Sequence, residues 1–311
     1  PNLFHACSHQ QTTLVLANVR LSQRSLEGYQ RWAGQLAAEA LQQVAWAAVQ
    51  GEPDRQRLIE LGVDVDKVQV TGSIKFDLTL PIDISQHGEA LRSELGSERP
   101  VWIAASTREG EESQVLDAHR KLLQKIPDAL LILVPRHPER FNAVAKQANA
   151  ANLRMVRRSE GSTCNGEVQL YLGDTMGEML LLYAASDVAF VGGSLVPTGS
   201  HNMLEPAALG KPVLFGPHRY NFAEISQLLI DQKAAQEVAD STVLSQAVVK
   251  LLQNRELRLQ QGGQGKAVVE QNRGALKRMS DKIRHCLPFR RRNLNSWVRS
   301  GWQLRSQTEI R

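Results

Sequence analysis

Residues 191–206 contain the most informative pattern of the chain. The apolar run Val188–Val191 ends in two glycines, and a polar loop and a short helical segment closed by Gly210 follow it. This order is typical of nucleotide sites, because glycines let a ligand approach the backbone and N–H groups at a helix start attract phosphate or sugar oxygens. Glu205 lies inside that segment, and we expect its carboxylate to accept hydrogen bonds from two ribose hydroxyls. For the loop taken alone, a glycine-rich turn with a solvated glutamate is an equally good interpretation.

Five strands are predicted to end in polar or glycine-rich motifs. Ligands of parallel α/β sheets bind at the carboxyl ends of the strands. The five motifs together therefore predict one cleft along one edge of the sheet. The strands are expected at 101–105, 129–134, 168–172, 188–191 and 212–215, and the motifs that follow them begin at Ser106, Pro135, Gly173, Gly192 and Gly216.

Two cationic side chains have the chemistry to neutralise a phosphate. Arg136 directly follows a predicted strand, where its guanidinium can make two parallel hydrogen bonds to an anion; a surface pair with Glu139 is the alternative. Lys75 follows an earlier strand, where it would stabilise a leaving phosphate, and a solvated lysine is the alternative. His137 either binds the ligand or is structural, and Arg140 is expected to support the loop.

The residues after the third of the five predicted strands have two interpretations, a ligand contact or a helix cap. Met176, Gly177 and Glu178 are expected at a helix N-terminus, whose N–H groups suit a base edge or a phosphate. Capping by Asp174 or Thr175, with Glu178 completing a capping box, explains the same residues.

A second acidic group, Glu109, Glu111 and Glu112, is expected in the first turn of a helix, where the helix dipole favours acids. No metal site is expected, because the eight histidines are scattered along the chain.

The elements that must position these residues alternate along the chain. Apolar runs of strand length between helical patterns predict an α/β fold with parallel sheets covered on both faces. A proline-containing stretch at 77–86 breaks this rhythm and marks a domain boundary. Further strands are expected at 13–19, 44–49 and 68–72, and helices at 25–43, 53–61, 111–125, 139–150, 176–185 and 202–209. Residues 241–282 are predicted to be mostly helical, with a possible interruption at Gly262 and Gly263.

Composition narrows the class of protein. No apolar run approaches the length of a membrane helix, and three widely separated cysteines favour a reducing compartment. Seven arginines and one acid lie in 284–311, so the rest of the chain is nearly neutral, which argues against nucleic-acid binding. This tail either meets anionic lipid or is disordered without a role. Because the chain begins with Pro1, a missing upstream segment is expected.

Several of these motifs occur in a fixed order: Gly-Ser-Ile-Lys-Phe-Asp, Ser-Thr-Arg-Glu-Gly-Glu-Glu, Pro-Arg-His-Pro-Glu-Arg, Gly-Asp-Thr-Met-Gly-Glu, and Gly-Gly-Ser-Leu followed by His-Asn-Met-Leu-Glu-Pro. Together they resemble the bacterial 3-deoxy-D-manno-octulosonic acid (Kdo) transferases of lipopolysaccharide assembly. The resemblance implies a GT-B-like fold with a complete C-terminal Rossmann-like domain. It divides the chain into the end of an acceptor-side domain (1–78), a linker and first helix (79–98), a donor domain with C-terminal helices (99–287) and a disordered basic tail (288–311).

The resemblance also implies a function. It indicates an inverting, metal-independent transfer of Kdo from CMP-Kdo to the lipid A precursor (lipid IVA), without a cofactor. The location implied is the cytoplasmic face of the bacterial inner membrane, peripheral or anchored through the missing N-terminus. Lys75 matches the lysine that stabilises the transition state. The CMP contacts implied are Pro135, Arg136, Met176, Gly177, Glu178, Asn202, Met203, Leu204 and Glu205, and the supporting residues expected are Ser106, Gly193, Ser194 and His201.

Three departures from the family pattern qualify this expectation. The family's base glutamate, a second functional glutamate and the membrane-associating segment all lie upstream of Pro1. Ser200 stands where the family usually has a glycine. Residues 289–311 have no counterpart in the family. The alternatives are a GT-B transferase that uses another nucleotide sugar, and a nucleotide-binding remnant without turnover.

Overall fold

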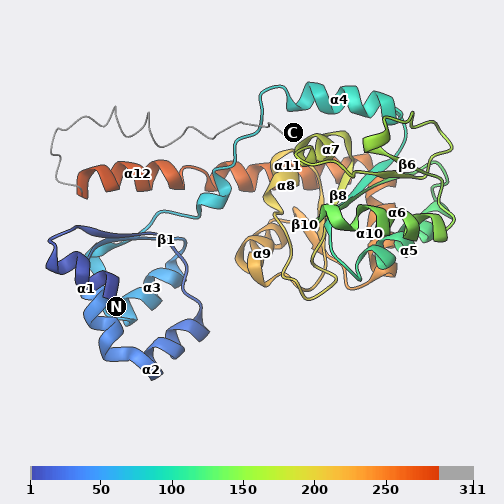
Figure 1. The fold of residues 1–311 in the computed structure, drawn as a ribbon. Coiled ribbons are helices and arrows are strands. Elements are labelled where there is room, and N and C mark those ends of the chain that lie inside the picture. The colour runs from blue at the N-terminus through green and yellow to red at the C-terminus, as the bar shows by residue number, and fades with distance from the viewer. Residues whose placement is uncertain (1, 287–311) are drawn as a thin grey trace, which may run out of the picture. The chain divides into compact units, whose positions relative to one another are not determined.

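The computed structural model describes residues 2–286, which belong to two compact units (Figure 1). One unit runs to Ile74 and resumes at Gly274, and the other is Lys75–Arg273. The division therefore lies a few residues before the proline-containing stretch that was expected to mark it. The basic tail, 288–311, lies outside the described residues.

The first unit is built on a three-stranded parallel sheet with the order β1-β2-β3. Val44 and Ala47 of the central strand pack against Leu58 and Val63, which buries one face of the sheet. Its elements are α1 (Asn2–His9), β1 (Leu14–Val19), α2 (Gln23–Gln42), β2 (Val44–Val49), α3 (Glu52–Glu60), η1 (Val65–Lys67), β3 (Val68–Val70) and α12 (Ala275–Cys286). The short turn η2 (Ile74–Phe76) spans the division between the units.

Helix α12 was expected in the donor domain, but its contacts place it in the first unit. Ala275 and Met279 lie one turn apart on α12 and pack against Trp46 and Ala48 of β2. Arg278 adds a hydrogen bond from Nε to the backbone oxygen of Thr71 at 2.9 Å. The apolar stripe of this helix thus fits the open face of the small sheet.

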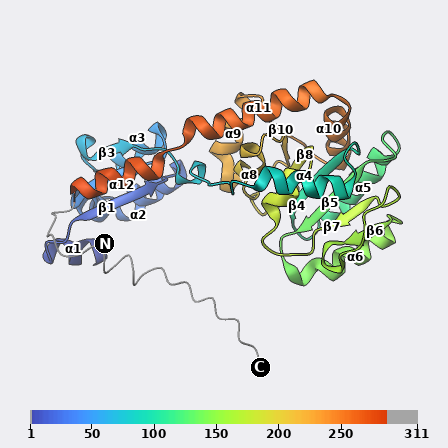
Figure 2. The same cartoon turned by 90° about the horizontal axis from the view of Figure 1, so that it is seen from above.

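The second unit is a seven-stranded parallel sheet with the order β10-β9-β8-β4-β5-β7-β6, which Figure 2 shows from above. Its strands are β4 (Val101–Thr107), β5 (Leu130–Pro135), β6 (Met155–Arg157), β7 (Leu170–Leu172), β8 (Val188–Val191), β9 (Val213–Phe215) and β10 (Ala235–Glu237). Its α-helices are α4 (Ile84–Leu95), α5 (Glu112–Leu123), α6 (Phe141–Ala150), α7 (Met179–Ala185), α8 (Leu204–Ala208), α9 (Ala223–Asp231), α10 (Ser241–Gln253) and α11 (Arg255–Asn272). Short 3-10 turns complete it: η3 (Pro138–Arg140), η4 (Arg158–Glu160) and η5 (Tyr220–Phe222).

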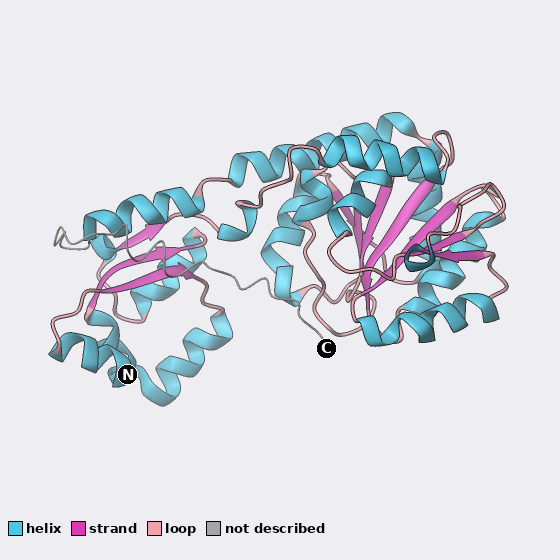
Figure 3. Ribbon diagram, turned by 45° about the horizontal axis from the view of Figure 1, so that its top comes forward, coloured by secondary structure: helices cyan, strands magenta, loops and turns pink. Residues whose placement is uncertain are grey.

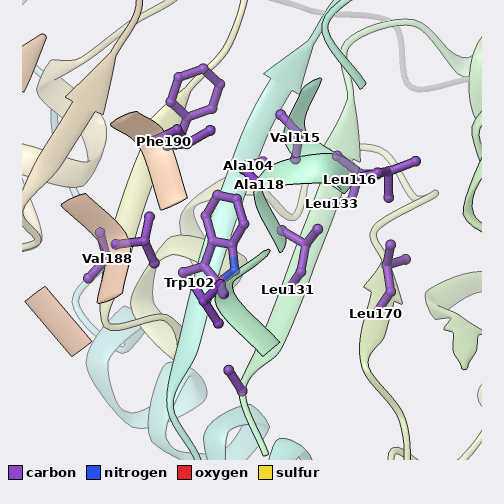
Figure 4. Packing of buried hydrophobic residues seen from close by; sticks show 14 of the residues in the cluster. Trp102, Ala104, Val115, Leu116, Ala118, Leu131, Leu133, Leu170, Val188 and Phe190 are labelled. Carbon is purple, nitrogen blue, oxygen red and sulfur yellow. The ribbon is translucent and has the colours of Figure 1, made fainter. Parts of the chain in front are cut away.

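Helices cover both faces of this sheet (Figure 3). Helices α5, α6 and α10 bury the face that carries Trp102, Leu131 and Phe190 (Figure 4). Helices α4 and α7 bury the opposite face, and α8, α9 and α11 pack around β8, β9 and β10. Because helices cover both faces of the sheet, only the loops at the strand ends are accessible to a polar ligand.

Most predicted elements are present, and the bounds of β2 and β8 agree with those expected. The sequence analysis did not identify α1, β6, α9 and β10. The predicted interruption of the helix at Gly262 and Gly263 is wrong, because α11 continues through both residues. A Cβ atom added at Gly262 would lie 1.9 Å from the backbone oxygen of Gly210, so this glycine permits close packing of α11.

Candidate nucleotide site

A cavity of about 300 Å³ lies at the carboxyl ends of the strands of the second unit. It is lined by Ser106, Val134, Pro135, Arg136, Thr175, Met176, Gly177, Met179, Leu182, Tyr183, His201, Asn202 and Glu205. The segments after β4, β5, β7 and β8 all contribute, which confirms the expected cleft for four of the five strand ends. The fifth, after β9, contributes no lining residue; there Gly216 N–H donates to Ser194 Oγ at 2.8 Å.

A larger cavity of about 420 Å³ lies near the starts of β4 and β8, at the opposite edge of the sheet. Arg92, one of its lining residues, donates to the backbone oxygen of Ala185 and to Asp187, both at 2.9 Å. These bonds join α4 to the segment between α7 and β8. We assign the ligand site to the carboxyl-end cavity, where loops rather than strand starts provide the lining.

One side of the carboxyl-end cavity is cationic. Arg136 is exposed and forms no salt bridge with any residue in 2–286; its expected alternative partner, Glu139, lies 3.7 Å from His137 instead. Arg108 contacts His137 and donates from Nε to His201 Nε2 at 3.1 Å. Arg136 is therefore free to bind an anion.

His201 is a neutral side chain at this corner. Burial, aided by the charges of Arg108 and Arg136, lowers its pKa to about 4. Since its Nε2 accepts from Arg108, the remaining ring proton belongs on Nδ1. His201 is therefore a hydrogen-bond donor at neutral pH and not a second cation.

Across the cavity, Glu205 provides a carboxylate. Asn202 Nδ2 donates to one of its oxygens at 3.1 Å, while the Asn202 side-chain oxygen accepts from the Leu204 N–H at 3.1 Å. Burial raises the pKa of Glu205, and the Asn202 hydrogen bond opposes that rise. Glu205 forms no salt bridge with a described residue, so its oxygens retain capacity for ligand hydroxyls.

Several residues expected to contact the ligand have other roles in the structure. The side chains of Met203 and Leu204 are fully buried in the core under α8, so a ligand can reach only their backbone. Glu178 does not line the cavity, because it pairs with Arg158 at 2.9 Å and accepts a hydrogen bond from Thr175. The Arg158 hydrogen bond lowers the pKa of Glu178.

The expected capping box before α7 is absent. Glu178 itself occupies the N-cap position and makes no capping hydrogen bond with its side chain. Asp174 instead accepts from Arg157 Nε at 2.7 Å and from the Ser159 backbone N–H at 2.9 Å. Helix α7 begins only at Met179, so Met176 and Gly177 form a loop that lines the cavity.

The glycine loop after β8 is satisfied from inside the protein. Glu111 is fully buried and accepts hydrogen bonds from the N–H groups of Gly193, Ser194 and Leu195 at 2.7, 3.0 and 2.9 Å. Burial raises the pKa of Glu111, and these hydrogen bonds oppose the rise. These three backbone N–H groups therefore already hold a carboxylate and are not available to a phosphate.

The acidic motif around Glu111 performs three different tasks. Glu112 is also buried and pairs with Arg140 at 3.1 Å, which explains why Arg140 supports the neighbouring loop. Glu109 is exposed and lies 3.3 Å from the same arginine. The sequence predicted three equivalent first-turn acids, but depth in the fold separates them.

Two serines beside the cavity have unusual backbone conformations. Ser106 and Ser200 have φ values of 57° and 70°, in the left-handed region that favours glycine. Position 200 is where the sequence comparison expected glycine. Non-glycine residues in this region store strain and occur often at binding sites.

Lys75 is exposed and does not line the cavity. Its Nζ donates to the backbone oxygen of Asn221 at 3.3 Å and lies 4.1 Å from the centre of the Phe222 ring. Both partners belong to η5, so the ammonium is fixed to the second unit.

The sequence analysis did not identify the apolar wall of the cavity. Met179, Leu182 and Tyr183 lie on one face of α7, at the i, i+3 and i+4 spacing of a helix. This spacing was readable, but a core face has the same pattern. Within residues 2–286, no cluster of metal-ligating side chains is found, and no helix has the length and hydropathy needed to cross a membrane.

Comparisons with known proteins show the family to which the chain belongs. A family described as 3-deoxy-D-manno-octulosonic-acid transferase (kdotransferase) matches residues 1–78. The chain is 41% identical to the 3-deoxy-D-manno-octulosonic acid transferase of Haemophilus influenzae, over 94% of this chain and 68% of that protein. It is 37% identical to the Bordetella pertussis transferase, over 91% of this chain and 66% of that protein. The chain thus spans about two thirds of the length of these two relatives.

Solved structures show the same fold class. The C-terminal CMP-Kdo binding domain of WaaA from Acinetobacter baumannii is 36% identical, with a TM-score of 0.58, and the match covers 61% of this chain and 99% of that domain. Anabaena Alr3699/HepE in complex with UDP is 15% identical with a TM-score of 0.54, over 91% of this chain and 75% of that one, which bears on the fold alone. The expected GT-B-like α/β class is confirmed.

Proposed function

Because the chain belongs to the family of 3-deoxy-D-manno-octulosonic acid transferases, we propose that its second unit binds CMP-Kdo and that the whole enzyme transfers Kdo to the lipid A precursor. The proposed acceptor, lipid IVA, is a glycolipid, so the reaction would take place at a membrane surface, and the family resemblance implies the cytoplasmic face of the inner membrane. CMP-Kdo is the donor substrate, and no cofactor is part of the proposal.

One observation supports this proposal most strongly: the same cavity has on one side an arginine without an acidic partner among residues 2–286, and on the other a glutamate whose oxygens can accept further hydrogen bonds. Arg136 would bind the phosphate through its planar guanidinium. Glu205 would accept hydrogen bonds from the ribose. The apolar side chains of Val134, Met179 and Leu182 offer surface to the base.

The proposed reaction is a single displacement. A hydroxyl oxygen of the acceptor attacks the anomeric carbon of Kdo, the bond from that carbon to the phosphate oxygen breaks, and the configuration inverts. The hydroxyl proton passes to a carboxylate base, which the family places upstream of Pro1. CMP departs with an added negative charge, and Arg136 and Lys75 would compensate that charge electrostatically.

Donor competition tests the assignment. Titration calorimetry of the chain with CMP, UDP and ADP is expected to show tightest binding for CMP. Glu205→Ala should weaken CMP binding at a cost of roughly 1–3 kcal/mol, if the lost hydrogen bonds are to a buried charge. Equal affinity for the three nucleotides would favour another nucleotide-sugar transferase, and an unchanged affinity in folded Glu205→Ala would reject the ribose contact.

Lys75 is tested by separating rate from binding in the complete enzyme. If it acts on charge that develops in the transition state, Lys75→Ala should lower kcat by about 10²–10³-fold and leave the donor Kd nearly unchanged. Lys75→Arg should not fully restore the rate, because a planar guanidinium does not replace a compact ammonium point charge in a tight cleft. A change in Kd alone would contradict the role.

A further inference from the structure

Tyr183 is a buried tyrosine with one unexplained polar group. The residue is only 1% exposed, and its ring packs in the apolar cluster between the sheet and helices α4 and α7. It nevertheless lines the carboxyl-end cavity, so the small exposed part of the side chain faces that cavity. Among residues 2–286, none forms a hydrogen bond with its hydroxyl.

The fully buried side-chain atoms without a hydrogen-bond partner among residues 2–286 are Gln43 Oε1 and Trp46 Nε1, so the unpartnered Tyr183 hydroxyl is accessible and a ligand in the cavity can reach it. The phenol is also close enough to Glu205 to feel its charge. Burial, with the nearby Glu205 carboxylate, raises the pKa of Tyr183 well above its ordinary value. The hydroxyl therefore keeps its proton at all physiological pH values and is available as a donor.

Resting on the proposed function, we infer that Tyr183 and Glu205 together select a ribonucleotide over a deoxyribonucleotide. A ribose hydroxyl can donate its proton to the Glu205 carboxylate while its oxygen accepts from the Tyr183 hydroxyl. The two protein groups are complementary in this respect, since one only accepts and the other donates. A deoxyribose at the same position would leave the Tyr183 hydroxyl and a Glu205 oxygen without partners.

The local structure favours a specificity role. Tyr183 lines the cavity together with Met179, one helical turn before it on α7, and its side chain belongs to the buried apolar cluster that includes residues of β4 and β5. Glu205 is held by the Asn202 hydrogen bond. Both groups are thus positioned before the ligand arrives, and preorganised polar groups discriminate against analogues that lack the matching hydroxyl.

The test compares two proteins and three ligands. Binding of CMP, 2′-deoxy-CMP and 3′-deoxy-CMP is measured by calorimetry for the wild type and for Tyr183→Phe. We expect the wild type to bind CMP more tightly than at least one deoxy analogue, and Tyr183→Phe to weaken CMP binding by about 3- to 10-fold. For the analogue that lacks the contacted hydroxyl, the same substitution should leave the affinity unchanged, and this analogue identifies the hydroxyl.

Tyr171→Phe is the matched control, because Tyr171 belongs to the same cluster but its hydroxyl accepts from Arg158 Nη1 at 3.2 Å. Any effect of Tyr171→Phe should be equal for the ribose and deoxyribose ligands. If Tyr183→Phe also weakens all three ligands equally, or none, the inference is wrong although the proposed function stands. If the wild type binds none of the three nucleotides, the proposed function fails and the inference with it.

Discussion

The loops after β8 and β5 both end at the carboxyl edge of the same sheet, but they differ in how their polar groups are satisfied. After β8, three backbone N–H groups point at the buried carboxylate of Glu111. After β5, the Arg136 guanidinium has no acidic partner among the described residues. The glycine-rich loop has the more familiar sequence, yet the open cation is the better candidate to bind a ligand. Unsatisfied groups indicate function more directly than loop composition does.

The closed loop should be sensitive to its carboxylate. Glu111→Ala would leave three backbone N–H groups buried without an acceptor, and we expect the free energy of unfolding to fall by roughly 3–5 kcal/mol. Glu111→Gln should cost less, because its amide oxygen still accepts. Urea denaturation measures the loss. The matched control is Glu109→Ala, whose side chain is 87% exposed and should change stability by less than about 0.5 kcal/mol. Equal effects of the two alanine variants would contradict the closed-loop description.

Substitution of Arg136 should affect ligand binding and leave stability nearly unchanged, the opposite of what is expected for Glu111. Arg136→Ala is expected to weaken CMP binding by roughly 10- to 100-fold, since it removes a charge-assisted contact to phosphate. Its stability should stay close to that of the wild type, because no ion pair is lost. Cytidine lacks the phosphate and should bind both proteins equally. Arg140→Ala provides the contrast: it breaks a pair with buried Glu112 and should reduce stability. A large stability loss in Arg136→Ala would show a structural role instead.

The histidine beside the closed loop adds a pH dependence to the comparison. His201 has a pKa of about 4 in the folded protein, below the ordinary value of 6.5, chiefly because of burial. The unfolded chain therefore binds the proton more readily, and stability should fall as the pH is lowered from 6.5 toward 4. In His201→Gln this acid-induced loss should be smaller. Burial also lowers the pKa of His119 to about 4. This histidine is unchanged in the variant, so part of the dependence of stability on pH should remain. Identical slopes for both proteins would contradict the lowered pKa of His201.

The smallest effect is expected at Ser200, where φ is 70°. Ser200→Gly removes the steric cost of this conformation and should raise stability by about 1 kcal/mol, or the melting temperature by roughly 2–4 °C. The neighbouring Gly199→Ala should be destabilising, because a Cβ there would lie 2.4 Å from Asn221 Nδ2 and φ is 92°. Calorimetric melting of both variants checks the pair. A lower melting temperature for Ser200→Gly would mean that the serine side chain contributes more than the strain costs.

The sequence predicted most regular elements because their signals are local. Val44–Val49 and Val188–Val191 are continuous apolar runs between polar segments, and both are strands with those bounds. The short strands β6 and β10 were not identified, since Met155–Arg157 and Ala235–Glu237 have mixed composition and pair only because neighbouring strands are in place. Helix α12 was identified but was expected in the other domain.

Several residues of the candidate site were predicted from the motifs that follow the strands. Arg136, Asn202 and Glu205 line the cavity as the sequence indicated, and Ser106 and His201 lie there too. Met203, Leu204 and Glu178 were also expected to contact CMP, but their side chains do not line the cavity. Helix phase buries the first two in the core, and long-range pairing joins Glu178 to an arginine. A one- or two-residue shift of a helix start is beyond what residue types alone resolve.

The sequence by itself determined most of the alternating strands and helices, the polar motifs at the strand ends and the family. These depend on spacing along the chain. Only the tertiary structure decided that Glu111 satisfies the glycine loop 82 residues away, that Arg136 has no acidic partner in the described part of the chain, and that Tyr183 faces the cavity from an apolar cluster. Each of these depends on which groups meet across the fold and how much water reaches them, and burial and partnership between distant residues are not encoded in any local pattern.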